Sequence, residues 1–85
     1  MREFTYVVTD TQGIHSRPAG LFVQEASRCK CSVTISKDGV EVDAKRILGV
    51  IKLGAKHGDE VTVRCEGPDE DAAIEKLSKY MQENM

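Results

Sequence analysis

The sequence has no tryptophan, and its 85 residues include only two phenylalanines, two tyrosines and two prolines. So few aromatic rings leave little for nucleobases to stack on, and no clustered basic stripe accompanies them, so we expect no nucleic-acid partner. No run approaches the roughly 18 apolar residues that cross a bilayer, and the opening residues Met1–Thr5 lack the apolar core of a signal peptide. We therefore expect a cytoplasmic protein with no membrane insertion.

Cysteine is present in an odd number, three, which argues against a secreted disulfide framework and for reduced thiols. Cys29-Lys30-Cys31, with Cys65 and His57, also suggests a small metal-binding module as an alternative. No C-x-x-C pair occurs, however, and the two thiols of a C-x-C pair between a helix end and a strand start should point in different directions. We expect three buried small hydrophobes and no bound metal.

The charged residues are unevenly distributed along an otherwise ordinary globular composition. Hydrophobic residues make up 40% and charged residues 31%, so we expect one folded domain over residues 1–85. Residues 1–56 hold nine Lys/Arg against six Asp/Glu, whereas residues 57–85 hold three against eight. This distribution favours an acidic protein over a nucleic acid as the partner of the first part.

The hydrophobic periodicity predicts seven elements. Alternating residues predict strands around 4–8, 33–35, 40–44 and 61–65, and Asp38-Gly39 marks a hairpin between the second and third. Helical spacing predicts helices from Ser16 to about residue 28, over 47–53, and after Asp69 as N-cap to about residue 81. The order β-α-β-β-α-β-α, with strands that each bury one face, predicts an α/β (α+β) open-faced β-sandwich: a four-stranded, mainly antiparallel sheet with three helices on one face.

His15 lies between the end of the first strand and the start of the first helix. The free N–H groups and the dipole at a helix N-terminus form an anion site, which suits a phosphate and favours the neutral imidazole that a nitrogen nucleophile requires. Arg17, two residues later, offers paired donors for phosphate oxygens. On these grounds alone, an exposed loop histidine with no special role is the alternative reading.

The segment Gly13-Ile14-His15-Ser16-Arg17-Pro18-Ala19 closely resembles the phosphorylation-site motif of the histidine-containing phosphocarrier (HPr) family of the bacterial sugar phosphotransferase system. The resemblance extends over the whole chain, including its length, its element order, the 47–50 segment and the closing helix.

The resemblance implies a phosphoryl relay rather than an enzyme with its own turnover. Enzyme I would phosphorylate His15, on Nδ1 in this family, and His15 would pass the group to the A domain of an enzyme II. Arg17 and the backbone N–H groups of Ser16 and Arg17 would contact the phosphate, and no cofactor is implied. We expect a monomer. The alternative of another class is an HPr-like regulatory paralogue that acts by non-covalent protein binding.

A docking surface is expected beside His15. A short helix over a sheet can turn only one stripe inward, so Val50 and Leu53 can be core while some of the other apolar residues face water. With the outer face of the first helix, they form the expected docking patch: Gly20, Leu21, Gln24, Arg46, Ile47, Leu48 and Ile51. A basic rim is expected from Arg17, Arg28, Lys45, Arg46 and Lys52.

Arg46 departs from the family pattern. Regulated members of the family carry a serine at the start of the short helix, which a dedicated kinase phosphorylates, whereas no hydroxyl occurs at Lys45, Arg46 or Ile47. We therefore expect this control to be absent or displaced to another position. Ser16, by contrast, is expected to be a helix cap or a phosphate-adjacent donor.

Overall fold

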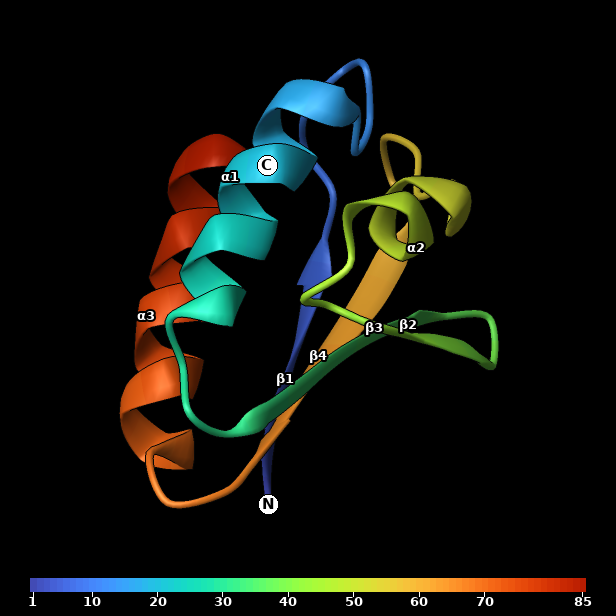
Figure 1. Cartoon of the computed structure of the whole chain (residues 1–85). Coiled ribbons are helices and arrows are strands. Elements are labelled where there is room, and N and C mark those ends of the chain that lie inside the picture. The colour runs from blue at the N-terminus through green and yellow to red at the C-terminus, as the bar shows by residue number, and fades with distance from the viewer.

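A computed structural model describes residues 1–85, and it contains four strands and three helices in the expected order (Figure 1). The strands are β1 (Arg2–Val7), β2 (Ser32–Lys37), β3 (Val40–Asp43) and β4 (Glu60–Glu66). The helices are α1 (Ser16–Ser27), α2 (Ile47–Lys52) and α3 (Glu70–Asn84).

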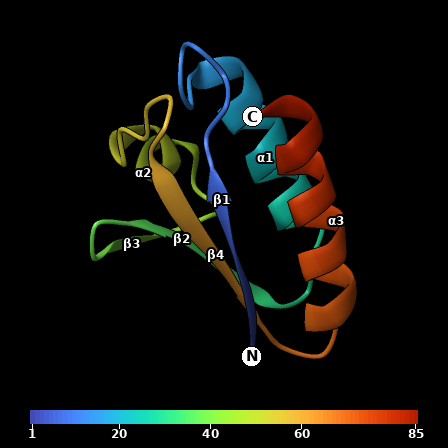
Figure 2. The same ribbon diagram turned by 180° about the vertical axis from the view of Figure 1, so that it is seen from behind.

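The four strands form one antiparallel sheet in the order β1-β4-β2-β3, which confirms the predicted open-faced architecture. The helices lie on one side of it, as Figures 1 and 2 show from opposite directions. Every second side chain of β2 and β4 points to the helical side of the sheet, which explains why the helices cover that face only. Their neighbours along the strands are more accessible, whereas these side chains are at most 1% exposed: Val33, Ile35, Val61, Val63 and Cys65. This buried face rests on α1 and α3.

The hairpin between β2 and β3 has the predicted turn. Asp38 and Gly39 both adopt positive φ angles, 52° and 81°, as a tight two-residue hairpin turn requires. Val40 is 58% exposed, although it alternates with half-buried Val42 and buried Ala44. It starts the edge strand directly after the turn.

Helices α1 and α3 pack against each other through aromatic and aliphatic side chains. Phe22 is fully buried, and its ring centroid lies 6.3 Å from that of Tyr80. Ala73, Leu77 and Met81 form the buried stripe of α3, while Ile74 is half-buried. None of the three helices has the length and continuous apolarity needed to cross a membrane.

The N-terminus of α3 differs in detail from the prediction. Asp69 occupies the N-cap position, but its side chain makes no capping hydrogen bond. Its Oδ2 accepts the N–H of Lys30 at 2.9 Å and its Oδ1 that of Cys31 at 2.8 Å, so it fastens the α1–β2 connection to α3. These charge-favouring bonds keep the pKa of Asp69 below its ordinary value, with the Lys30 N–H as the largest cause.

Candidate functional site

The loop before α1 is held rigidly by backbone contacts. Gly13 has φ 71°, and its N–H bonds to the carbonyl of Asp10 at 2.9 Å. The N–H of Ile14 bonds to the carbonyl of Ala55 at 2.9 Å. A Cβ on Gly13 would lie 2.6 Å from the same Ala55 oxygen, so only glycine allows this close approach. The loop therefore delivers His15 to the start of α1 in a fixed position.

His15 is the N-cap residue of α1, with extended backbone angles of −109° and −179°. Its carbonyl accepts the first helical bond, from the N–H of Ala19 at 3.0 Å. The N–H groups of Ser16 and Arg17 have no acceptor within the protein, and residue 18 is proline. The expectation that Ser16 caps the helix is wrong, because Ser16 is already the first helical residue and no side chain caps α1. Open N–H groups at a helix N-terminus are able to bind an anion, which is the role expected of Ser16 and Arg17.

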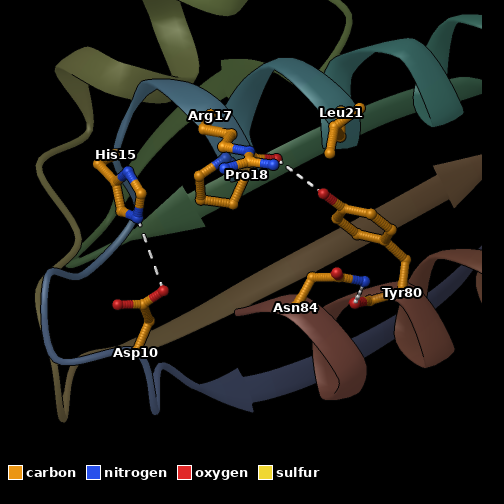
Figure 3. A pocket seen from close by; sticks show the side chains of 7 residues that line it. All are labelled: Asp10, His15, Arg17, Pro18, Leu21, Tyr80 and Asn84. Carbon is orange, nitrogen blue, oxygen red and sulfur yellow. Dashed lines mark hydrogen bonds and ion pairs between the residues drawn. The ribbon is translucent and has the colours of Figure 1, made fainter.

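One edge of the His15 ring faces a carboxylate. Nε2 lies 3.6 Å from Oδ2 of Asp10, beyond hydrogen-bonding range but close enough for electrostatic attraction (Figure 3). A negative charge on this side favours the tautomer that carries its proton on Nε2, which leaves the lone pair on Nδ1. The His15 side chain is 37% exposed, so part of the ring can be approached from solvent.

The imidazole borders a shallow cavity of about 280 Å³. Its lining residues come from the 10–15 loop, α1 and α3 (Figure 3): Asp10, His15, Arg17, Pro18, Leu21, Tyr80 and Asn84. The Tyr80 hydroxyl donates to the Pro18 carbonyl at 3.0 Å, which ties α3 to the first turn of α1. Burial raises the pKa of Tyr80, so the phenol stays protonated and keeps donating.

The sequence reasoning missed three of these residues: Asp10, Tyr80 and Asn84. Asp10 had a usable signal, because an aspartate two residues before a turn typically accepts a backbone N–H, as its Oδ1 does here from Gln12 at 2.8 Å. Tyr80 and Asn84 had none, since only the packing of α3 beside α1 brings them to the site.

Arg17 is exposed, lines the cavity and makes no ion pair with a carboxylate of the protein. Its guanidinium, drawn beside Pro18 in Figure 3, is therefore free to bind a ligand in the cavity that His15 also lines. A free guanidinium next to open backbone N–H groups suits an anion with several oxygens.

The expected docking patch is a connected surface. Leu21, 46% exposed, lines the cavity, and α1 packs against α2. A Cβ on Gly20 would lie 3.5 Å from Cδ1 of Ile47, so α2 sits directly on the face of α1 next to Leu21. Leu48 is 75% exposed, whereas Val50 is fully buried and Leu53 half-buried, as expected. Ile51 and Gln24 are also exposed and extend the surface along both helices.

The basic residues around this patch are not equally free. The ammonium of Lys45 donates to the Cys29 carbonyl at 2.9 Å, so Lys45 closes the end of α1 instead of forming an open rim. Arg28 pairs with Glu25 at 3.4 Å, and Arg46 with Asp43 at 3.8 Å. Arg46 is the N-cap of α2 and its side chain is 82% exposed, so it remains accessible beside Ile47.

The three cysteines are buried and free of disulfides, as expected. Burial, with Asp69 as a further cause, raises the pKa of the Cys31 thiol to about 12, so it is no nucleophile at neutral pH. The expectation that the C-x-C thiols point apart is wrong: the Sγ atoms of Cys29 and Cys31 and a carboxylate oxygen of Asp69 all lie within 4.8 Å of one another. The chain turns sharply between α1 and β2, which brings both thiols to the same side.

Comparison with known proteins identifies a matching family model and similar chains. A family model described as the PTS HPr component phosphorylation site matches residues 2–83. The HPr-like protein Crh of Bacillus subtilis is 48% identical over 73 residues, which are 86% of each chain. The phosphocarrier protein HPr of Mycoplasma genitalium is 34% identical over 85 residues, covering 99% of this chain and 97% of that protein.

Solved structures resemble the whole fold. HPr from Thermoanaerobacter tengcongensis superposes with a TM-score of 0.94 at 38% identity, covering 99% of this chain and 94% of that one. A crystal structure of Crh from Bacillus subtilis, described as a domain-swapped, intertwined dimer, superposes with a TM-score of 0.79 at 44% identity, covering 100% and 98% of the two chains. Monomeric state therefore stays a prediction for this chain.

Proposed function

Because the chain belongs to the HPr family of the phosphotransferase system, we propose that it is a phosphocarrier: His15 accepts a phosphoryl group from enzyme I and passes it to the A domain of an enzyme II. One observation carries this proposal. His15 lies at the N-terminus of α1, beside two backbone N–H groups that have no acceptor in the protein. The Arg17 guanidinium, which lines the same cavity, is also free of ion pairs within the protein.

The geometry supports in-line transfer through Nδ1. The Nδ1 lone pair attacks phosphorus while the bond to the donor breaks, so one P–N bond forms as the donor releases its phosphoryl group. Asp10 offsets the positive charge that the ring gains, from the Nε2 side. Arg17 and the N–H groups of Ser16 and Arg17 stabilise the phosphoryl oxygens. The reverse steps deliver the group to the next protein, whose own residues replace these contacts.

A regulatory role by non-covalent binding is the second candidate, because the HPr-like protein Crh is among the similar relatives. Onward transfer separates the two functions. We expect the chain, once phosphorylated by enzyme I and phosphoenolpyruvate and then freed of both, to lose its phosphate to an added enzyme II A domain. A chain that binds partners but neither gains nor passes on phosphate would be a regulatory protein.

Arg17→Lys should slow phosphoryl transfer about tenfold without unfolding the protein. Lysine keeps the charge but loses the planar paired donors, and a tenfold slower transfer corresponds to a loss of about 1.4 kcal/mol of transition-state stabilisation. Rapid-quench kinetics with phosphorylated enzyme I measures the rate. Arg28→Lys, at the other end of α1, is the matched control and should transfer at the parent rate. Parent-rate transfer by Arg17→Lys would remove Arg17 from the site.

Leu48→Glu should weaken binding to both enzyme I and the enzyme II A domain by at least about tenfold. Leu48 is the most exposed hydrophobic side chain of the docking patch, and a carboxylate buried there without a partner costs several times the thermal energy. Isothermal titration calorimetry of both complexes tests this. Val40→Glu is the control, because Val40 is also an exposed hydrophobic residue but lies at the β2–β3 hairpin. This variant should leave both affinities unchanged. If Leu48→Glu binds normally, docking occurs elsewhere.

An ATP-dependent serine kinase of the regulatory type should leave this chain unlabelled, because Arg46 stands where regulated members of the family have the serine. Arg46→Ser would supply a hydroxyl at the N-cap of α2 and should gain one acid-stable phosphate. Phosphopeptide mapping after acid treatment distinguishes the two chains. Acid-stable phosphate on the parent protein, at Ser16 or any other hydroxyl, would contradict the prediction.

A further inference from the structure

A second group of chemically capable side chains lies at the opposite end of α1 from His15. Cys29 follows the end of α1, Cys31 directly precedes β2, and Asp69 directly precedes α3. Figure 1 shows these three chain segments converging at the end of the molecule where α3 begins. The two Sγ atoms and a carboxylate oxygen of Asp69 lie within 4.8 Å of one another.

These separations suit one small cation. In tetrahedral zinc sites the metal–sulfur and metal–oxygen distances place the ligand atoms roughly 3.5–4 Å apart, so small side-chain adjustments would close this group around an ion. The carboxylate is already oriented, because its two oxygens accept the N–H groups of Lys30 and Cys31. Each oxygen keeps a lone pair for a metal, and such fixed outer hydrogen bonds are typical of metal ligands.

The donor set selects the metal. Two sulfurs exclude magnesium and calcium, which require oxygen ligands, and favour a borderline-soft ion with tetrahedral geometry. Two thiolates and one carboxylate exceed the charge of a divalent ion by one, and the ammonium of Lys45, bonded to the Cys29 carbonyl at 2.9 Å, offsets part of that excess. Cys65 is fully buried within β4 and does not belong to this group of three ligand atoms, so the site is formed without it.

We propose that Cys29, Cys31 and Asp69 form a binding site for one zinc ion, with water at the fourth position on the side of half-buried Asp69. Binding releases the two thiol protons to solvent and breaks the weak bond from Cys29 Sγ to the Glu25 carbonyl, 3.5 Å long. The bound ion joins the end of α1, the start of β2 and the start of α3.

The test titrates the reduced full chain with Zn²⁺ in competition with a chromophoric zinc indicator. We expect one ion per chain, and at least tenfold weaker binding by Cys29→Ala and by Asp69→Asn. Cys65→Ala, which removes a buried thiol outside the site, is the matched control and should bind as the parent does. Co²⁺ in place of Zn²⁺ should give the near-ultraviolet thiolate-to-metal band in the parent and in Cys65→Ala.

Circular dichroism of every variant shows whether it is folded, so that weaker zinc binding is not mistaken for unfolding. Cys29 is 7% exposed, so Cys29→Ala should fold even if variants of the fully buried Cys31 do not. Absence of stoichiometric binding by the parent, unchanged binding by folded Cys29→Ala, or an equal loss in Cys65→Ala would each overturn the proposal.

Discussion

His15→Ala should accept no phosphoryl group from enzyme I and phosphoenolpyruvate, a complete loss, while its stability changes by less than about 1 kcal/mol. The imidazole is the only nucleophile at the cavity that can form a phosphoramidate, because the other lining side chains are a carboxylate, a guanidinium, a phenol, an amide and hydrocarbons. The side chain is 37% exposed and makes no hydrogen bond that the fold requires, so its removal should leave packing intact.

His57→Ala is the matched control for this loss. His57 is the second of two histidines and lies exposed in the loop between α2 and β4. We expect His57→Ala to be labelled as fully as the parent by intact-mass measurement. If His15→Ala were labelled, or if only His57→Ala lost the label, His15 would not be the phosphoryl acceptor.

Gly13→Ala should lower the free energy of unfolding by about 2–4 kcal/mol and slow phosphorylation of His15. Two costs combine. The backbone of an alanine is strained at a φ of 71°, and its Cβ would lie 2.6 Å from the Ala55 carbonyl oxygen and 2.9 Å from Cα of Lys56. Both obstacles are backbone atoms, so the loop that leads to His15 must move. Urea unfolding and phosphorylation rates measure the two effects.

Gly39→Ala separates the strain from the collision. Gly39 has a similar φ of 81°, but a Cβ there would meet nothing within 4 Å. We expect Gly39→Ala to cost only about 1 kcal/mol, the conformational part alone, and to be phosphorylated at the parent rate. Equal costs for the two variants would mean that the contact with Ala55 does not hold the loop.

Local patterns predicted most of the fold because each element carries its own signal. Alternation in 61–65 specified which side chains of β4 face inward, and Asp38-Gly39 specified the hairpin turn. The exposed apolar side chains of the short helix were also predictable. Five of the seven residues in 47–53 are apolar, more than one buried face of a helix can hold, and Leu48 does face outward.

The errors concern contacts between elements distant in sequence. Asp69 is the N-cap residue of α3 as predicted, but its side chain makes no capping bond, because its carboxylate accepts the N–H groups of Lys30 and Cys31, almost 40 residues earlier. The geometry of Cys29 and Cys31 was wrong because spacing alone does not show how the chain turns between a helix and a strand. Similarly, His15 and Arg17 were found from their local motif, whereas the contribution of Tyr80 depends on how α3 docks.

The most direct test of the phosphocarrier proposal is the intact mass of the unaltered chain after incubation with enzyme I and phosphoenolpyruvate. We expect one phosphoryl group per chain, lost in mild acid as a phosphoramidate is, and located on His15 by fragmentation at neutral pH. No added mass, or an acid-stable phosphate on a hydroxyl, would contradict the assignment of His15 as the phosphoryl acceptor.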